Sequence, residues 1–285
     1  MKTIRTSGRR IRTKRPIEIV AIYVLLVIVL IGVLFPIYWM VTSSFKTRIQ
    51  ALTLPPLWIF KPTFDNYIGI FQHRPFAYYL LNSIIIATST VIFTLIIGTL
   101  AAFSLARFKF RWSDDIALWF LSTQMIPPII ALIPFFLILR ALYMLDTHLG
   151  LIMIYSTFTL PYIIWMMRGF IAEIPPELEE SAMVHGCSRA KAFLKITVPL
   201  ILPGFVATGI FCMIMCWNEF LVALILTGDT AKTLPVATID FLSERGIMWS
   251  HVCAAGTVMM IPIVGMSFFV QKYMIRGLAY GAIKG

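Results

Sequence analysis

The most informative feature of this 285-residue sequence is how little charge it carries. Only 13% of its residues are Asp, Glu, Lys or Arg, whereas 59% are hydrophobic. A soluble domain has roughly 25% charged residues, so this composition excludes an ordinary soluble protein. Catalytic signatures are missing as well: the sequence contains no GxSxG, no HExxH and no phosphate-cradling Gly-Lys-Ser/Thr loop. An integral membrane enzyme is therefore disfavoured.

Cysteine and histidine are scarce too, with four residues of each. Cys212 and Cys216 lie within an apolar run, where packing is the simpler interpretation, and the sequence indicates no secreted disulfide framework. The histidines are scattered through predicted loops, and no clustered metal-ligand spacing occurs. We therefore expect the chain to bind no metal and no cofactor, and if ATP supplies energy, another chain must hydrolyse it.

The formal net charge of +11 is concentrated near the N-terminus. A basic tail, residues 1–16, adjoins a run from Ile19 to Phe45 that carries no charge. This arrangement is typical of a cytosolic topogenic signal close to anionic lipid, and it does not indicate nucleic-acid binding. The apolar run is longer than the core of a cleavable signal peptide, so we predict an uncleaved first span.

Six segments are long and apolar enough to cross a bilayer, which takes about 20 mainly apolar residues per helix. The sequence predicts an all-α integral membrane domain over residues 17–275. Most Lys and Arg residues fall on one side if the N-terminus is inside, so both termini are predicted to be cytosolic. Residues 168–199 then form an inner loop, residues 41–77 and 227–251 outer loops, and residues 276–285 a cytosolic tail. The predicted spans are Ile17–Met40, Tyr78–Ala106, Ile116–Leu139, Leu149–Met167, Leu200–Leu226 and Val252–Gln271.

Polar side chains inside apolar spans indicate a transport path, because exposing them to lipid costs free energy. Gln124 stands beside Pro127 and Pro128, which either open a path or form a structural kink. Glu219 is the one carboxylate well inside a predicted span; it is either functional or a hydrogen-bond acceptor for a neighbouring helix. Tyr162 and Trp165 either contact substrate or simply pack. The candidate substrate-path residues are Asn82, Gln124, Tyr162, Trp165, Asn218 and Glu219.

Residues 174–188, in the inner loop, have the clearest local signals. Two prolines suit a helix start, and three glutamates follow where the helix dipole favours negative charge: Pro175, Pro176, Glu177, Glu179 and Glu180. Gly186 tolerates the left-handed conformation that ends many helices. Ser188 can cap a second helix, which we expect to run until Pro199. The segment is predicted to be a helix, a turn and a helix facing the cytosol.

The same segment contains an ordered motif, Glu180-Ser181-Ala182 followed by Gly186, Phe193, Ile196 and Pro199-Leu200. It resembles the Glu-Ala-Ala loop of ABC importer permeases. Further matches run from residue 64 to the last residue and are similar to the MalG-type permeases of carbohydrate importers. They are Phe64-Asp65-Asn66-Tyr67, Asn82-Ser83, Trp217-Asn218-Glu219-Phe220, Thr233-Leu234-Pro235-Val236 and Gly281-Ala282-Ile283-Lys284-Gly285. The sequence departs from the family at Ser181 and Cys187, which replace Ala, and at His185, which replaces Asp.

The resemblance implies a type I ABC importer (MetI-like) permease fold in a bacterial inner membrane. It also implies partners: a second permease, two cytosolic ATPases that use ATP and Mg, an extracytoplasmic binding protein, and a carbohydrate or sugar derivative as substrate. A secondary transporter or channel without an ATPase is the alternative, weakened by the single intramembrane acid. The implied ATPase-docking residues are Glu177, Glu180, Ser181, Ala182, His185, Gly186 and Cys187, together with Lys284 and Gly285 of the tail.

Overall fold

The structure is a computed structural model, and it describes residues 16–72, 75–108, 110–243 and 246–282. Within these residues, five helical stretches are long and apolar enough to cross a membrane, and one bent helix pair is a sixth candidate if it counts as a single span. The five stretches are α1 (Pro16–Ser44), α4 (Phe76–Arg107), α7 (His148–Ala172), the run α9 (Arg189–Ala192), η1 (Phe193–Thr197) and α10 (Val198–Asn218), and α13 (Trp249–Ala282). The predicted all-helical, multi-span architecture is confirmed.

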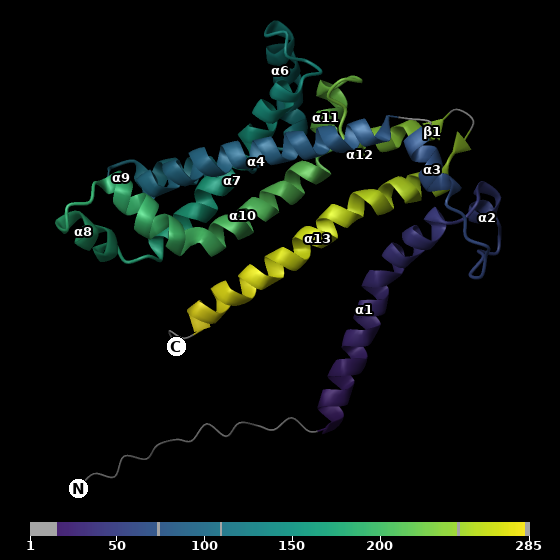
Figure 1. The fold of residues 1–285 in the computed structure, drawn as a ribbon, viewed down its shortest axis with the longest axis horizontal. Coiled ribbons are helices and arrows are strands. Elements are labelled where there is room, and N and C mark those ends of the chain that lie inside the picture. Colours follow the sequence, from purple (N-terminus) through teal and green to yellow (C-terminus); the bar gives the residue numbers. More distant parts are fainter. Residues whose placement is uncertain (1–15, 73–74, 109, 244–245, 283–285) are drawn as a thin grey trace.

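The centre of the bundle is the pairing of α4 with α7, against which α10 packs (Figure 1). Small residues allow this close approach, as in many membrane helix pairs. A Cβ added to Gly98 of α4 would lie only 2.6 Å from Cγ2 of Ile163 on α7. Ile163 and Met167 are fully buried at this contact, so α4 and α7 form the rigid frame on which the other elements are placed.

The first helix, α1, is the least enclosed part of the bundle. None of the most apolar window of α1 is buried, and its main packing partner is α13. Figure 1 shows α1 diverging from the other long helices towards its N-terminal end. Near Ser44, α1 meets a small cap made of α2 (Arg48–Leu52) and α3 (Asp65–Gln72), where the Ser44 hydroxyl lies 2.7 Å from the Tyr67 hydroxyl.

The third predicted span, Ile116–Leu139, is not one continuous helix. The chain forms α5 (Ser113–Thr123) and α6 (Pro128–Ala141), bent by 92° at the break between them. Pro127 has a ψ of 129°, the extended conformation expected of a residue that precedes a proline. Two successive residues without an N–H cannot continue the α5 hydrogen bonds, so the helix ends and restarts.

The fifth predicted span, Leu200–Leu226, is also different in the structure. The helix begins earlier, at Arg189, and passes through Pro199 by way of the π-helical η1, so the predicted stop at Pro199 is wrong. Pro199 lies in the first turn of α10, directly after the π-helical residues, so the hydrogen-bond pattern of the helix changes just before the proline. At the other end, the helix stops at Asn218, Glu219 is extended, and α11 (Leu221–Leu226) follows.

The ends of the bundle carry different elements (Figure 1). One end, which we call the α8 end, holds α8 (Glu177–Val184) and α9. The opposite end, the α12 end, holds α2, α3, α12 (Leu234–Ala237), η2 (Thr238–Phe241) and the hairpin β1 (Leu242–Ser243) with β2 (Gly246–Ile247). A second apolar core that includes Phe76, Trp217, Leu234 and Phe241 fixes these short elements to the long helices.

Candidate functional site

The α8–α9 segment, residues 174–192, has the predicted helix–turn–helix form. α8 starts after Pro176, and Gly186 adopts a φ of 85°. The Gly186 N–H donates to the Met183 carbonyl and the Cys187 N–H to the Ala182 carbonyl, both at 3.0 Å, which is the Schellman arrangement that ends a helix. The Ser188 hydroxyl then accepts from the Lys191 N–H and caps α9, as predicted.

The predicted docking residues lie on the outside of this segment. Glu177, Glu180, Ser181, His185 and Gly186 are exposed, whereas Ala182 and Cys187 are half-buried. Apolar side chains are exposed beside them: Leu178 is 46% and Val184 is 85% exposed. Lys284 and Gly285 lie outside the described residues. The described part of the predicted set therefore forms one accessible surface at the α8 end of the bundle.

Glu179 behaves differently from its two neighbouring glutamates. Its carboxylate pairs with Arg107 at 2.9 Å and accepts from the Thr197 hydroxyl at 2.7 Å. Arg107 ends α4 and also donates to the Ile174 carbonyl, at 2.9 Å. The Arg107 and Glu179 side chains are only 10% and 8% exposed, so this is a buried ion pair. It joins α8 to α4 and to η1, and thereby attaches the α8–α9 segment to the bundle.

Further contacts hold the same end of the bundle together. Arg168, near the end of α7, pairs with Asp114 in the first turn of α5. The rings of Phe103 and Phe193 lie 4.6 Å apart, and the Arg189 guanidinium lies 4.7 Å from the centre of the Phe108 ring. A displacement of the α8–α9 segment would therefore act directly on the ends of α4 and α10.

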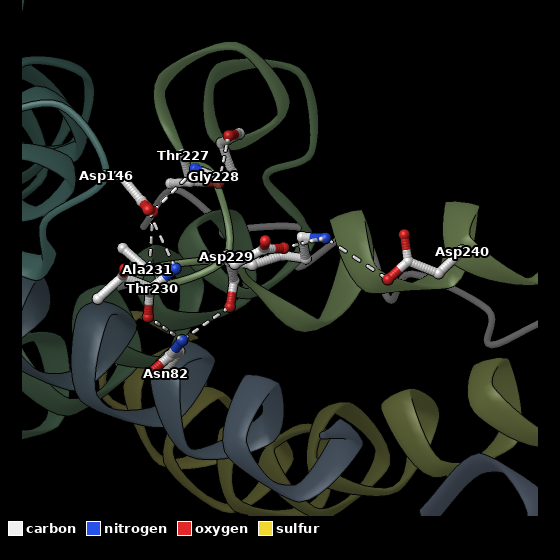
Figure 2. A network of polar contacts seen from close by, with 10 residues as sticks. Asn82, Asp146, Thr227, Gly228, Asp229, Thr230, Ala231 and Asp240 are labelled. Carbon is white, nitrogen blue, oxygen red and sulfur yellow. Dashed lines mark hydrogen bonds and ion pairs between the residues drawn. The ribbon is translucent and has the colours of Figure 1, made fainter. Parts of the chain in front are cut away.

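The α12 end contains a second polar network, which involves the predicted residue Asn82 (Figure 2). The Asn82 amide donates to the carbonyls of Thr230 at 2.9 Å and Lys232 at 3.0 Å, while its Oδ1 lies 2.8 Å from His148 Nε2. Asn82 is 1% exposed. Its polar atoms are thus occupied in holding the loop between α11 and α12 against α4, and it does not line the cavity described below.

Asp146, which the sequence reasoning missed, holds the same loop from the other side (Figure 2). Its carboxylate accepts from the N–H groups of Gly228 and Ala231 at 2.8 Å and of Thr230 at 3.1 Å. Burial raises the pKa of Asp146, but the hydrogen bonds from Ala231, Thr230 and Gly228 outweigh burial and lower the pKa below its ordinary value. The sequence contains one local signal for this role. The residues around Gly228 are typical of a turn, and the backbone N–H groups of such a stretch need a hydrogen-bond acceptor.

A third feature is a cavity of about 330 Å³ at the level of the two helix breaks. It brings together three of the predicted substrate-path residues, Gln124, Asn218 and Glu219. Tyr162 instead packs against the main apolar core, and Trp165 lines a separate cavity near Arg168. The lining residues are Thr123, Gln124, Ile126, Pro128, Tyr155, Phe158, Thr159, Met215, Cys216, Asn218 and Glu219.

Comparisons with known proteins agree with these features. Residues 94–280 match the family described as "Binding-protein-dependent transport system inner membrane component". The diacetylchitobiose uptake system permease protein DasC of Streptomyces coelicolor is 34% identical over 261 residues, which cover 91% of this chain and 95% of the relative. The trehalose/maltose transport system permease protein MalG of Thermococcus litoralis is 35% identical over 256 residues, which cover 88% of this chain and 92% of the relative.

A solved structure shares the fold. It is a bacterial ABC transporter involved in the import of the acidic polysaccharide alginate, and one of its chains superposes with a TM-score of 0.77 at 24% identity, covering 92% of this chain and 98% of that one. The predicted type I ABC importer permease fold is confirmed. The helices, the α8–α9 segment and these matches lead to one conclusion: the chain belongs to the family of inner membrane components of binding-protein-dependent transport systems, and it is a permease subunit of an ABC importer.

Proposed function

We propose that this permease imports a carbohydrate or sugar derivative. The observation that carries the proposal is the likeness, at about a third identity over nearly the whole chain, to permeases named for diacetylchitobiose and for trehalose and maltose. An extracytoplasmic binding protein delivers the sugar to the α12 end. A second, homologous permease completes the membrane path.

In the proposed complex, two cytosolic ATPase subunits hydrolyse ATP with Mg, and the permease itself catalyses nothing. The α8 end faces the cytosol of the bacterium, the α12 end faces outward across the inner membrane, and both termini are cytosolic. Residues 168–199 are then the coupling loop within the transmembrane domain 17–275, residues 41–77 and 227–251 are outer loops, and residues 1–16 and 276–285 are cytosolic tails. Lys284 and Gly285 reach the ATPases.

The docking surface consists of Glu177, Glu180, Ser181, Ala182, His185, Gly186 and Cys187. Glu177 and Glu180 are exposed and make no ion pair with any described residue, so their carboxylates are available to basic side chains of an ATPase. Leu178 and Val184 supply apolar area to the same contact. Because the buried Glu179–Arg107 pair attaches α8 to α4, movement of the ATPase is transmitted to the long helices.

Co-purification and uptake test this proposal together. The complete complex, reconstituted in proteoliposomes, should take up at least one of maltose, trehalose and N,N′-diacetylchitobiose with ATP inside and the cognate binding protein outside. Glu180→Lys should abolish co-purification of the ATPase because it places like charges in contact. Glu173→Lys, an equally exposed acid outside α8, is the matched control and should retain it. Uptake that persists with a catalytically inactive ATPase and stops when the proton gradient collapses would instead establish a secondary transporter.

A further inference from the structure

Two interrupted helices meet at the 330 Å³ cavity. The α5–α6 break contributes Thr123, Gln124 and Ile126, and the end of α10 contributes Asn218 and Glu219. Irregular backbone within an apolar span is tolerated where it is buried in protein or lines a water-filled cavity. In secondary transporters, substrate sites are typically formed by discontinuous membrane helices, which provides an analogy for this cavity. The position of this cavity therefore calls for a chemical explanation.

The polar atoms of the cavity residues offer acceptors. The Gln124 amide donates to the Phe158 carbonyl at 2.5 Å, and the Asn218 amide donates to the Ile214 carbonyl at 2.9 Å. Glu219 Oε1 accepts from the Val222 N–H at 2.9 Å and so caps α11. These bonds leave one oxygen on each of the three side chains without a partner among the described residues. Three acceptors match a ligand that presents several donors, such as adjacent hydroxyl groups.

The remaining wall is aromatic and lacks positive charge. Tyr155 and Phe158 of α7 line the cavity, and Phe158 is held edge-to-face by Phe135 at 5.8 Å. Rigid aromatic walls with a few placed polar groups are typical of small-molecule sites, and the volume lies at the lower end of their usual range. No Lys or Arg is among the described lining residues, so nothing there compensates an anionic ligand next to Glu219.

We propose that this cavity is a contact site for a neutral, hydroxyl-rich ring, with Glu219, Gln124 and Asn218 accepting hydrogen bonds from its hydroxyls and Phe158 packing against its carbon face. The inference rests on the proposed import of a carbohydrate and adds a site and a charge preference to it. Anionic sugars are disfavoured, because a carboxylate or sulfonate placed beside Glu219 meets a like charge.

The test uses the complete complex in nanodiscs and whichever of maltose, trehalose and N,N′-diacetylchitobiose it transports. Asn218→Cys should react with a methanethiosulfonate reagent above the background of the native thiols, and the transported sugar should slow that reaction severalfold. Leu54→Cys, which is 86% exposed in the loop between α2 and α3 and outside the cavity, should react without protection. A disaccharide that contains glucuronic acid should not protect Asn218→Cys.

Two substitutions separate contact from packing. Glu219→Gln keeps the oxygen that caps α11 but loses the second carboxylate oxygen, and Phe158→Leu removes the aromatic wall; each should raise the sugar concentration for half-maximal protection by about tenfold, the usual effect of one lost contact. Tyr162→Leu, on the same helix but outside the cavity, is the matched control for Phe158→Leu and should leave that concentration unchanged.

The outcomes are distinguishable. Uptake of a neutral sugar without protection of Asn218→Cys, or equal half-maximal concentrations for the Phe158→Leu and Tyr162→Leu variants, would overturn the site alone. If an assembled, ATP-hydrolysing complex takes up none of the three sugars, the proposed carbohydrate substrate and the site are both wrong.

Discussion

Loss of the Glu179 carboxylate should detach the α8–α9 segment from the bundle. Both side chains of the Arg107–Glu179 pair are about nine-tenths buried, so removing one partner leaves the other as an uncompensated charge. Such losses cost about 3–5 kcal/mol. We expect Glu179→Ala and Arg107→Ala each to lower the free energy of unfolding by about that amount. The double variant should lose less than the sum, because the second change removes a charge that is already unpaired.

Unfolding of the purified permease in mixed micelles by increasing SDS would measure these differences. Glu173→Ala, which removes an exposed carboxylate with no ion pair among the described residues, is the control and should change stability by no more than about 0.5 kcal/mol. Glu180→Ala should weaken association with the ATPase while leaving the unfolding free energy unchanged, since that side chain is exposed. If Glu179→Ala unfolds at the same SDS concentration as Glu173→Ala, the attachment role is refuted.

Three further changes test other parts of the structure. Gly186→Val puts a β-branched residue at a φ of 85° without a new contact. We therefore expect the free energy of unfolding to fall by about 1–2 kcal/mol and amide exchange in α8 to become faster. Exchange as slow as in the wild type would contradict the turn geometry. Gly98→Val should overpack against Ile163 at a cost of about 1–3 kcal/mol, measured by SDS unfolding, with partial rescue by Ile163→Ala. Because the folded pKa of Asp146 lies below its ordinary value of 3.8, its stabilisation is complete above that pH and is lost as pH falls through the folded pKa. Asp146→Ala should therefore speed amide exchange in the loop between α11 and α12 near neutral pH but make little difference in strong acid.

Much of the fold could be predicted from local chemistry. Hydrophobic length predicted α1, α4 and α7 to within five residues, and capping rules predicted the Gly186 turn and the Ser188 cap. The prolines near residue 127 indicated an interruption, but the 92° bend depends on what α5 and α6 pack against, which no local rule specifies. Pro199 misled for a related reason, because the helix continues through it directly after a π-helical turn.

The candidate sites could also be predicted only in part from the sequence. No local rule shows that Glu179 is buried against Arg107 and Thr197, since Arg107 is far away in the chain. The cavity unites Gln124, Asn218 and Glu219 because two helix breaks happen to lie at the same level, which the separate spans did not reveal. Asn82 is the opposite case. It is a polar residue within a predicted span, but it binds a loop about 150 residues later in the chain and does not line the cavity.

The isolation of α1 has a consequence for how the protein is made. Its main packing partner, α13, is the last helix of the chain, and the ribosome begins to make it only after about 200 further residues. At about 5–20 residues per second, α1 waits in the bilayer for roughly 10–40 s. During that time the central part of α1 is surrounded by lipid, which its apolar composition permits, while its end near Ser44 can already contact the cap of α2 and α3. Final closure of the bundle is therefore a late, post-insertion event, and truncation within α13 should leave α1 inserted but without its partner.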